Sequence, residues 1–196
     1  TFMGNTHYAI EDMGIIRCIP GMTIISPSDA GQALKAFYAS WTLNKPVYIR
    51  FTGGLNCPVI YEQEFNYQIG KGIRLREGNQ IQIIATGSMV DRALKAAKIL
   101  EEKGISVDVV DMHTIKPLDM DILKKDVKLV VSVEEHSIIG GLGSAIAEAL
   151  STYSVHAPLL RLGIGDYFSQ VGEYEYLLEQ HGLSPEHIAN TIENNL

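Results

Sequence analysis

The sequence predicts an α/β protein whose open, mostly parallel sheets carry helices on both faces. Three observations support this prediction. Short apolar runs such as "IQIIAT" and "KLVVSV" are rich in β-branched residues, as strands buried on both faces are. Amphipathic stretches with the period of an α-helix separate these runs. Each stretch is long enough to connect two parallel strands, which a tight hairpin cannot do.

The composition is that of an ordinary globular protein, with 46% hydrophobic and 20% charged residues among 196. A net charge of −7 argues against binding to nucleic acid or to an anionic membrane surface. We recognise no signal peptide and no apolar run of the about 20 residues that span a bilayer, so we expect a cytoplasmic protein. Cys18 and Cys57 are too few for a disulfide framework or a zinc site, and we expect buried or half-buried thiols.

The first 52 residues predict a helix, a strand, a second helix and a second strand. Apolar residues at every third position of "AIEDMGIIRCI" favour a short helix, which Pro20-Gly21 ends. "MTIISP" predicts a strand. "SDAGQALKAFYASWTLN" predicts a helix with Ser28 or Asp29 as its N-cap, and "PVYIRF" predicts the second strand.

Residues 53–80 are rich in Gly and Asn and aperiodic, so we interpret them as a connection with one strand near "GIRLR". A regular alternation follows it. The predicted strands are "IQIIAT", "ISVDVVD", "VKLVVSVE" and "APLLRLGI". The predicted helices are "SMVDRALKAAKILEEKG" with Ser88 as cap and Gly104 just past its end, "PLDMDILKK" with Pro117 near its start, "GSAIAEALSTY", "GEYEYLLEQHG" and "SPEHIANTIENNL".

These elements divide the chain into a unit at residues 1–62, a linker at 63–80 and a unit at 81–196. The first unit is too short to fold comfortably alone, because about 60 residues bury only about 60% of their unfolded surface. The chain also begins on Thr1 rather than on Met. We therefore expect the first unit to be the back half of a domain, and the second unit to be complete.

Two motifs near the third strand of the second unit, a glycine-rich one and an acidic one, are candidates for ligand binding. "GGLGS" precedes a helix, but it departs from the dinucleotide-binding spacing, so we interpret its glycines as packing positions. Glu134, Glu135 and His136 lie at the carboxyl end of a strand, where ligands bind in open α/β sheets. The same residues could instead contact a neighbouring domain or subunit, and His113 has the same two interpretations.

His7 and Arg50 are the strongest candidates for chemistry. An imidazole can move protons or hold a polar substrate near neutral pH. A guanidinium at the end of a strand can bind a phosphate or a carboxylate through two parallel bonds. Taken alone, His7 could equally be structural or solvated, and Arg50 could form a surface ion pair. The other histidines, at 156, 181 and 187, are expected to be solvated in loops or at helix ends.

Four stretches resemble the transketolase family. "THYAIEDMGIIRCIPGMTIISPSD" is similar to the pattern T-H-x-x-I-E-D, followed by an arginine, an "IP-x-M" turn and a "P-[AS]-D" helix start. "KPVYIRFTGG" resembles the next strand of the family's pyrimidine-binding domain. "VVDMHTIKPLD" and "SVEEHSIIGGLGSAIAEAL" resemble its C-terminal domain, especially in the shorter, two-subunit members. The resemblance covers nearly the whole chain, in order and without large gaps.

The resemblance implies a partial pyrimidine-binding domain at 1–62 and a transketolase C-terminal domain at 81–196. It implies an intact homodimeric enzyme that binds thiamine diphosphate and a divalent metal, Mg or Ca, between two subunits. That enzyme would transfer a two-carbon ketol unit from a ketose phosphate to an aldose phosphate in pentose phosphate metabolism. The implied partners are phosphorylated sugars and an N-terminal transketolase section or subunit, with no nucleic acid and no membrane.

Within this resemblance, His7 matches the histidine that contacts substrate hydroxyls beside the reactive carbon of the cofactor. Arg50 matches the arginine that binds the substrate's phosphate. Met3 stands where the family often has an aspartate, which implies a different preference for the donor sugar. The family's cofactor-activating glutamate, its stacking aromatic residues and its metal ligands lie upstream or on a partner subunit. We therefore expect neither cofactor nor metal on this chain alone, and no activity from it.

Two other functions stay open. A deoxyxylulose-phosphate synthase, or the beta subunit of a 2-oxoacid dehydrogenase first component (E1 beta), belongs to the same superfamily, but Glu11-Asp12 after "THYAI" fits transketolase better. A non-catalytic dimerisation or regulatory module would fold and self-associate through residues 70–196 without contributing to turnover. Substitution of His7 and Arg50 in the complete enzyme separates this module from the catalytic functions.

Overall fold

A computed structural model describes residues 4–52, 57–124 and 126–196, and its main layer is a five-stranded sheet. The strands follow the order β3-β5-β4-β7-β8, and every neighbouring pair is parallel except β3 and β5. The strands are β3 (Ile73–Arg76), β4 (Ile81–Ala85), β5 (Val107–Asp111), β7 (Leu129–Ser137) and β8 (Leu159–Ile164). The predicted α/β fold with a mostly parallel sheet is confirmed, and β3 is the strand expected near "GIRLR".

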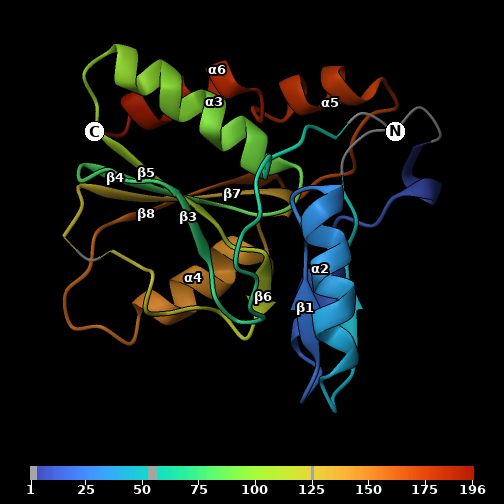
Figure 1. The fold of residues 1–196 in the computed structure, drawn as a ribbon. Helices are drawn as coiled ribbons and strands as arrows, with labels where there is room; N and C mark the ends of the chain where they lie inside the picture. The colour runs from blue at the N-terminus through green and yellow to red at the C-terminus, as the bar shows by residue number, and fades with distance from the viewer. Residues whose placement is uncertain (1–3, 53–56, 125) are drawn as a thin grey trace.

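Helices cover both faces of this sheet, as predicted (Figure 1). On one face lie α3 (Met89–Glu102), α5 (Tyr174–Gln180) and α6 (Pro185–Glu193), and on the other lies α4 (Leu142–Leu150). Alternate residues of β4 serve the two cores: Ile83 packs toward α3 and Ile84 toward α4. All five residues of β4 are buried, because strands flank both its edges and helices cover both its faces.

A second, three-stranded sheet stands beside the first (Figure 1). Its order is β2-β1-β6, with β1 (Thr23–Ile25) parallel to β2 (Val47–Ile49) and antiparallel to β6 (Thr114–Lys116). The helices of this region are η1 (Gly4–His7), α1 (Asp12–Arg17) and α2 (Ala30–Trp41). Because β6 follows β5 directly, a strand from the second half of the chain completes the sheet of the first half.

The predicted helix caps are partly confirmed. Asp29 is the N-cap of α2, and its carboxylate accepts a hydrogen bond of 2.7 Å from the backbone N–H of Gln32. Ser88 precedes α3 as predicted, but its hydroxyl makes no capping bond and donates to Glu135 instead. Gly104 follows the end of α3 with a φ of +79°, a conformation that glycine adopts at little cost.

The predicted helix over "PLDMDILKK" is wrong, because its described residues form turns after β6. Side chains from elsewhere bind the backbone groups that a helix would pair internally. The Gln82 side-chain carbonyl accepts from the N–H of Lys124 at 2.8 Å, and its amide donates to the carbonyl of Ile122 at 3.0 Å. Asp119 turns its own carboxylate to the N–H of Gly72, 3.0 Å away. Tertiary partners therefore override the local helical pattern.

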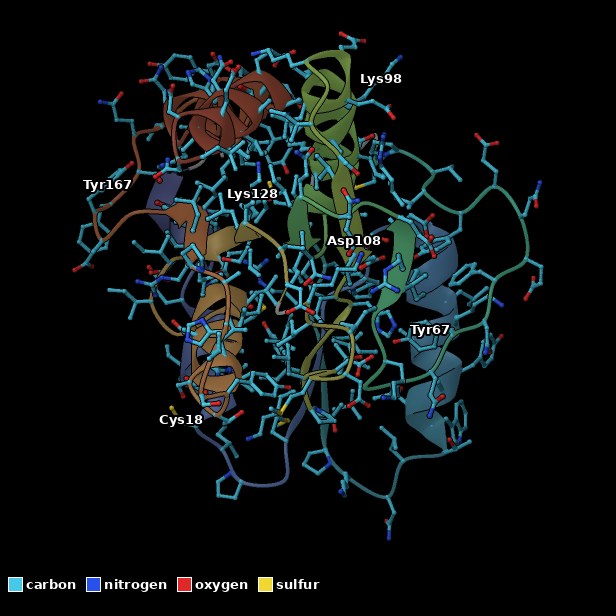
Figure 2. All side chains as sticks on the ribbon, turned by 90° about the vertical axis from the view of Figure 1, so that its left-hand side faces the viewer. Cys18, Tyr67, Lys98, Asp108, Lys128 and Tyr167 are labelled. Carbon is cyan, nitrogen blue, oxygen red and sulfur yellow. The ribbon has the colours of Figure 1, made fainter. Side chains whose placement is uncertain are left out.

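Cys18 and Cys57 are both exposed, so the expected burial of the thiols is wrong. Figure 2 shows Cys18 at the periphery of the molecule, whereas Asp108 lies inside it. No helix in the described part of the chain is both long and apolar enough to cross a membrane.

Candidate functional site

Arg50 directly follows β2 and forms a buried ion pair, where the sequence suggested a phosphate ligand or a surface pair. Its side chain is 7% exposed. Nε donates to both carboxylate oxygens of Asp12, at 3.0 and 2.8 Å. Nη2 donates to the backbone carbonyls of Ala9 at 3.1 Å and Glu135 at 3.0 Å. No hydrogen bond joins Nη1 to another described residue, so this nitrogen keeps its capacity to donate.

Asp12 is the first residue of α1 and the centre of this polar cluster. From the sequence, Asp12 counts only as part of the Glu11-Asp12 family pattern, with no role in the site. Besides Arg50, its carboxylate accepts a hydrogen bond of 2.8 Å from the hydroxyl of Tyr48 on β2. Burial, followed by the Asp12 hydrogen bond and charge, raises the pKa of Tyr48, so this hydroxyl keeps its proton and donates. An acidic residue in the first turn of a helix is usually explained by the helix dipole, so the sequence contained no sign of its distant partner.

His7 is the last residue of η1 and lies exposed, two residues before the Ala9 carbonyl that Arg50 binds. The structure thus brings the two sequence-predicted site residues into one region. Their roles toward a substrate stay predictions. Met3, where the resemblance implied a change in donor preference, lies outside the described residues.

The carboxyl end of β7 forms the opposite side of this region. His136 is fully buried, and burial lowers the pKa of its imidazole. Its Nδ1 lies 2.7 Å from the carbonyl of Ser137, while the backbone N–H of Gly14 donates to Nε2 at 3.3 Å. These contacts assign a neutral ring with its proton on Nδ1. Although Asp12 lies 3.8 Å from Nε2, the neutral ring makes no ion pair with it.

Glu134 is buried against the N-terminus of α4. Its two carboxylate oxygens accept hydrogen bonds from the backbone N–H groups of Leu142 at 2.6 Å and Gly143 at 2.8 Å. Burial raises the pKa of Glu134 to about 7, although these two bonds act in the opposite direction. A Cβ added to Gly141 would lie 2.0 Å from Oε2 of Glu134. The glycines of "GGLGS" therefore allow close packing around a protein carboxylate, as predicted.

Glu135 joins the site to the helices above the sheet. Its carboxylate accepts hydrogen bonds from the hydroxyls of Ser88 and Tyr174, the latter at 2.6 Å. Beside it lies a cavity of about 70 Å³ that Tyr8 and His181 also line. His181 is half-buried and lies within hydrogen-bonding distance of two hydroxyls, so the expectation of a solvated ring is wrong for this histidine. His156 and His187 are exposed, in agreement with the same expectation.

His113 belongs to a second buried cluster, away from Arg50. It is fully buried, stacks on Tyr67 with ring centroids 4.4 Å apart, and has its pKa lowered to about 4 by burial. Nearby, Asp111 accepts hydrogen bonds of 2.8 Å from Ser28, Gln32 and Tyr61. The first half of the chain contacts both "EEH" and His113: the N–H of Ser26 donates to the carbonyl of His113 at 2.8 Å, and Arg50 and Gly14 bind Glu135 and His136. These bonds agree with the contact interpretation, and ligand binding by either motif stays a prediction.

Two family models match the chain in succession: the transketolase pyrimidine-binding domain at residues 1–57 and the transketolase C-terminal domain at 70–188. A relative from Methanocaldococcus jannaschii, described as a transketolase C-terminal section, is 43% identical over 96% of this chain and 60% of its own length. The 6-deoxy-6-sulfo-D-fructose transketolase subunit of Clostridium sp. is 42% identical over 94% of this chain and 58% of its own.

Other relatives have a different name. The 1-deoxy-D-xylulose-5-phosphate synthase of Caldanaerobacter subterraneus is 38% identical over 96% of this chain and 31% of its own length. A solved structure described as a split-gene transketolase in an inactive beta4 tetramer superposes with a TM-score of 0.86 at 36% identity, covering 96% of this chain and 62% of that one. The chain thus spans about three fifths of the split relatives that it matches. By both family models and this fold, the chain belongs to the transketolase family.

Proposed function

We propose that this chain is the C-terminal section of a transketolase-type enzyme, which transfers a two-carbon ketol unit from a ketose phosphate to an aldose phosphate. The observation that carries the proposal is the match of both family models in their proper order along the chain. Relatives named as a transketolase section and as a transketolase subunit support it. We further propose a division into domains at 1–62 and 81–196, joined by a linker at 63–80 that contributes β3 to the main sheet.

The proposed enzyme needs an N-terminal transketolase section, on the same polypeptide or on a separate subunit, and works as a homodimer in the cytoplasm, in pentose phosphate metabolism. Thiamine diphosphate, held with a divalent metal, would supply the carbanion that carries the two-carbon unit. In the described part of the chain no three His, Cys, Asp or Glu side chains gather at a spot that could hold a metal. Because the family resemblance places the ligands of the metal and the diphosphate upstream of this chain, we propose that the N-terminal section carries them and that this chain alone is inactive.

His7 and Arg50 are the residues of this chain that we propose to contact substrate. The exposed imidazole of His7 can donate to, or accept from, the hydroxyls of a sugar. Arg50 would bind the sugar phosphate through Nη1, because Nε and Nη2 are held by Asp12 and by two backbone carbonyls. A guanidinium fixed in this way loses little entropy when it binds an anion.

The test uses the chain combined with the N-terminal section of its own enzyme, and measures ketol transfer at steady state. We expect His7→Ala to lower kcat for any ketose donor. Arg50→Ala should raise KM more for a phosphorylated donor than for a phosphate-free ketose. His156→Ala serves as the control, because His156 is an exposed histidine that lies before β8 and belongs to neither half of the proposed site. Unchanged transfer in both site variants would refute the proposed roles and favour the non-catalytic module.

A deoxyxylulose-phosphate synthase is the second candidate, because relatives with that name match almost the whole chain. The two functions differ in their product. An assembled enzyme that forms 1-deoxy-D-xylulose 5-phosphate and does not transfer ketol units would replace the first proposal with the second.

A further inference from the structure

The segment after His7 lies along the carboxyl end of β7 and the turn that follows it. Three hydrogen bonds join the two stretches: Ser137 N–H to the carbonyl of Ile10 at 2.7 Å, Gly14 N–H to His136 Nε2 at 3.3 Å, and Arg17 Nη1 to the carbonyl of Gly140 at 2.7 Å. A Cβ on Gly140 would come within 2.7 Å of the Cα of Gly14, so the backbones are in close contact. The first half of the chain therefore takes its position here from the second.

Arg50 closes this contact at the end nearest His7. Through one nitrogen, Nη2, it binds Ala9 in the segment and Glu135 on β7, which are far apart in the sequence. The bridge is buried, because the arginine side chain is 7% exposed. A hydrogen bond from a charged group to a backbone carbonyl is stronger than one from a neutral group. Arg50 is therefore the connection between the strand end and the residues that follow His7.

Asp12 holds Arg50 in this position. Both oxygens of its carboxylate accept hydrogen bonds from Nε of Arg50, and the Asp12 side chain is 9% exposed. The hydroxyl of Tyr48 on β2 donates to one of the same oxygens. Removal of the negative charge would leave a buried guanidinium without its directly bonded carboxylate, which proteins tolerate poorly. The arginine would then move toward solvent and release the carbonyl of Ala9.

We infer that Asp12 is a positioning residue, which acts through Arg50 to hold the segment that carries His7 against the carboxyl end of β7. This inference rests on the proposed function, because it gives His7 a task in ketol transfer. It also gives the second half of the chain a part in catalysis without any contact with substrate. Glu135 and Ser137 contribute only backbone atoms to this arrangement, so their side chains are not the means by which it works.

The first test measures amide hydrogen exchange in the full chain, together with the NMR signals of the His7 ring. Asp12→Asn keeps the size of the side chain and removes its charge. Asp91→Asn is the matched control, because Asp91 also lies in the first turn of a helix and pairs with a basic side chain, Lys95, at 2.6 Å. We expect exchange about tenfold faster at residues 8–17 in Asp12→Asn alone, with a shifted His7 signal. Unchanged exchange, or acceleration spread over the whole chain, would overturn the inference.

The second test measures ketol transfer by the same variants, assembled with the N-terminal section. Asp12→Asn should lower kcat about tenfold for phosphorylated and phosphate-free donors alike, since a displaced His7 affects both. Asp12→Glu, which restores the charge, should recover part of the loss. If His7→Ala lowers kcat and Asp12→Asn does not, Asp12 does not position His7. If His7→Ala has no effect, the proposed function loses His7, and the exchange experiment still decides whether Asp12 holds the segment.

Discussion

Replacement of Asp111 by Asn should change how the stability of the protein depends on pH. Asp111 ends β5 with no exposed surface, and burial raises its pKa from 3.8 to about 6. Ser28, Gln32 and Tyr61 all donate to Oδ2, while Oδ1 has no partner among the described residues. An asparagine can keep its carbonyl toward these three donors, so the variant mainly removes the charge.

The magnitude follows from the shift in pKa. Because the folded protein holds this proton more tightly than the unfolded chain does, stability is greatest below the unfolded pKa and falls as the pH rises through the folded one. A shift of about two units corresponds to about 3 kcal/mol at full ionisation. The carboxylate of Asp111 therefore costs about 3 kcal/mol near pH 7.5 and about 1 kcal/mol near pH 4.5. The free energy of unfolding of Asp111→Asn, relative to wild type, should therefore rise by about 2 kcal/mol as the pH is raised from about 4.5 to about 7.5.

Urea unfolding followed by far-ultraviolet circular dichroism measures this difference at both pH values. Fluorescence of the single tryptophan is less suitable, because Trp41 is 77% exposed in the folded protein. The comparison of variant with wild type cancels the contributions of Glu134 and His113, which titrate in the same range. Asp166→Asn, at an exposed carboxylate, should give no such change. Parallel pH profiles for Asp111→Asn and wild type would refute the reasoning.

Two further predictions concern packing and capping, and urea unfolding at neutral pH measures both. Gly140→Ala should cost more than Gly104→Ala: both glycines have a φ near +80°, but only the first has a backbone atom within 2.7 Å of the added Cβ. Strain alone predicts about 1–2 kcal/mol for Gly104→Ala, so equal losses would contradict the contact. Asp29→Ala should cost about 3 kcal/mol against about 1 kcal/mol for Ser184→Ala. Asp29 binds three backbone amides and Ser184 binds one, so equal effects would show that the bonds of Asp29 to residues 60 and 61 add nothing.

Most of the fold could be predicted because its signals are local. In α3, Ala93, Ala96, Ala97 and Leu100 recur with the helical period, and all four are buried. The runs that became β4, β5 and β7 are continuous and β-branched, because the strands are buried on both faces. The helix expected after Pro117 failed for the opposite reason, since its backbone partners are side chains from other parts of the chain.

The candidate site could be predicted only in part. His7 and Arg50 could be proposed from the sequence because their side chains have recognisable chemistry and a familiar sequence context, and their roles stay predictions. The link from Arg50 to Asp12 spans 38 positions and the link to Glu135 spans 85. No pattern within one helix or strand records such a pairing. The surroundings of Glu134 were equally hidden, because its partners are backbone N–H groups, which every residue except proline carries.

The pairing of β6 with β1 means that the three-stranded sheet cannot be completed until the second half of the chain has been synthesised. β1 needs β6 as its second neighbour, and the chain between them is about 90 residues long. At about 5–20 residues per second, a ribosome takes about 5–20 seconds to bridge that interval. Throughout this time one edge of β1 has no partner from its own chain, and an unpaired edge invites association with other chains. Chaperone dependence and yield on expression should therefore respond to the translation rate between residues 26 and 116.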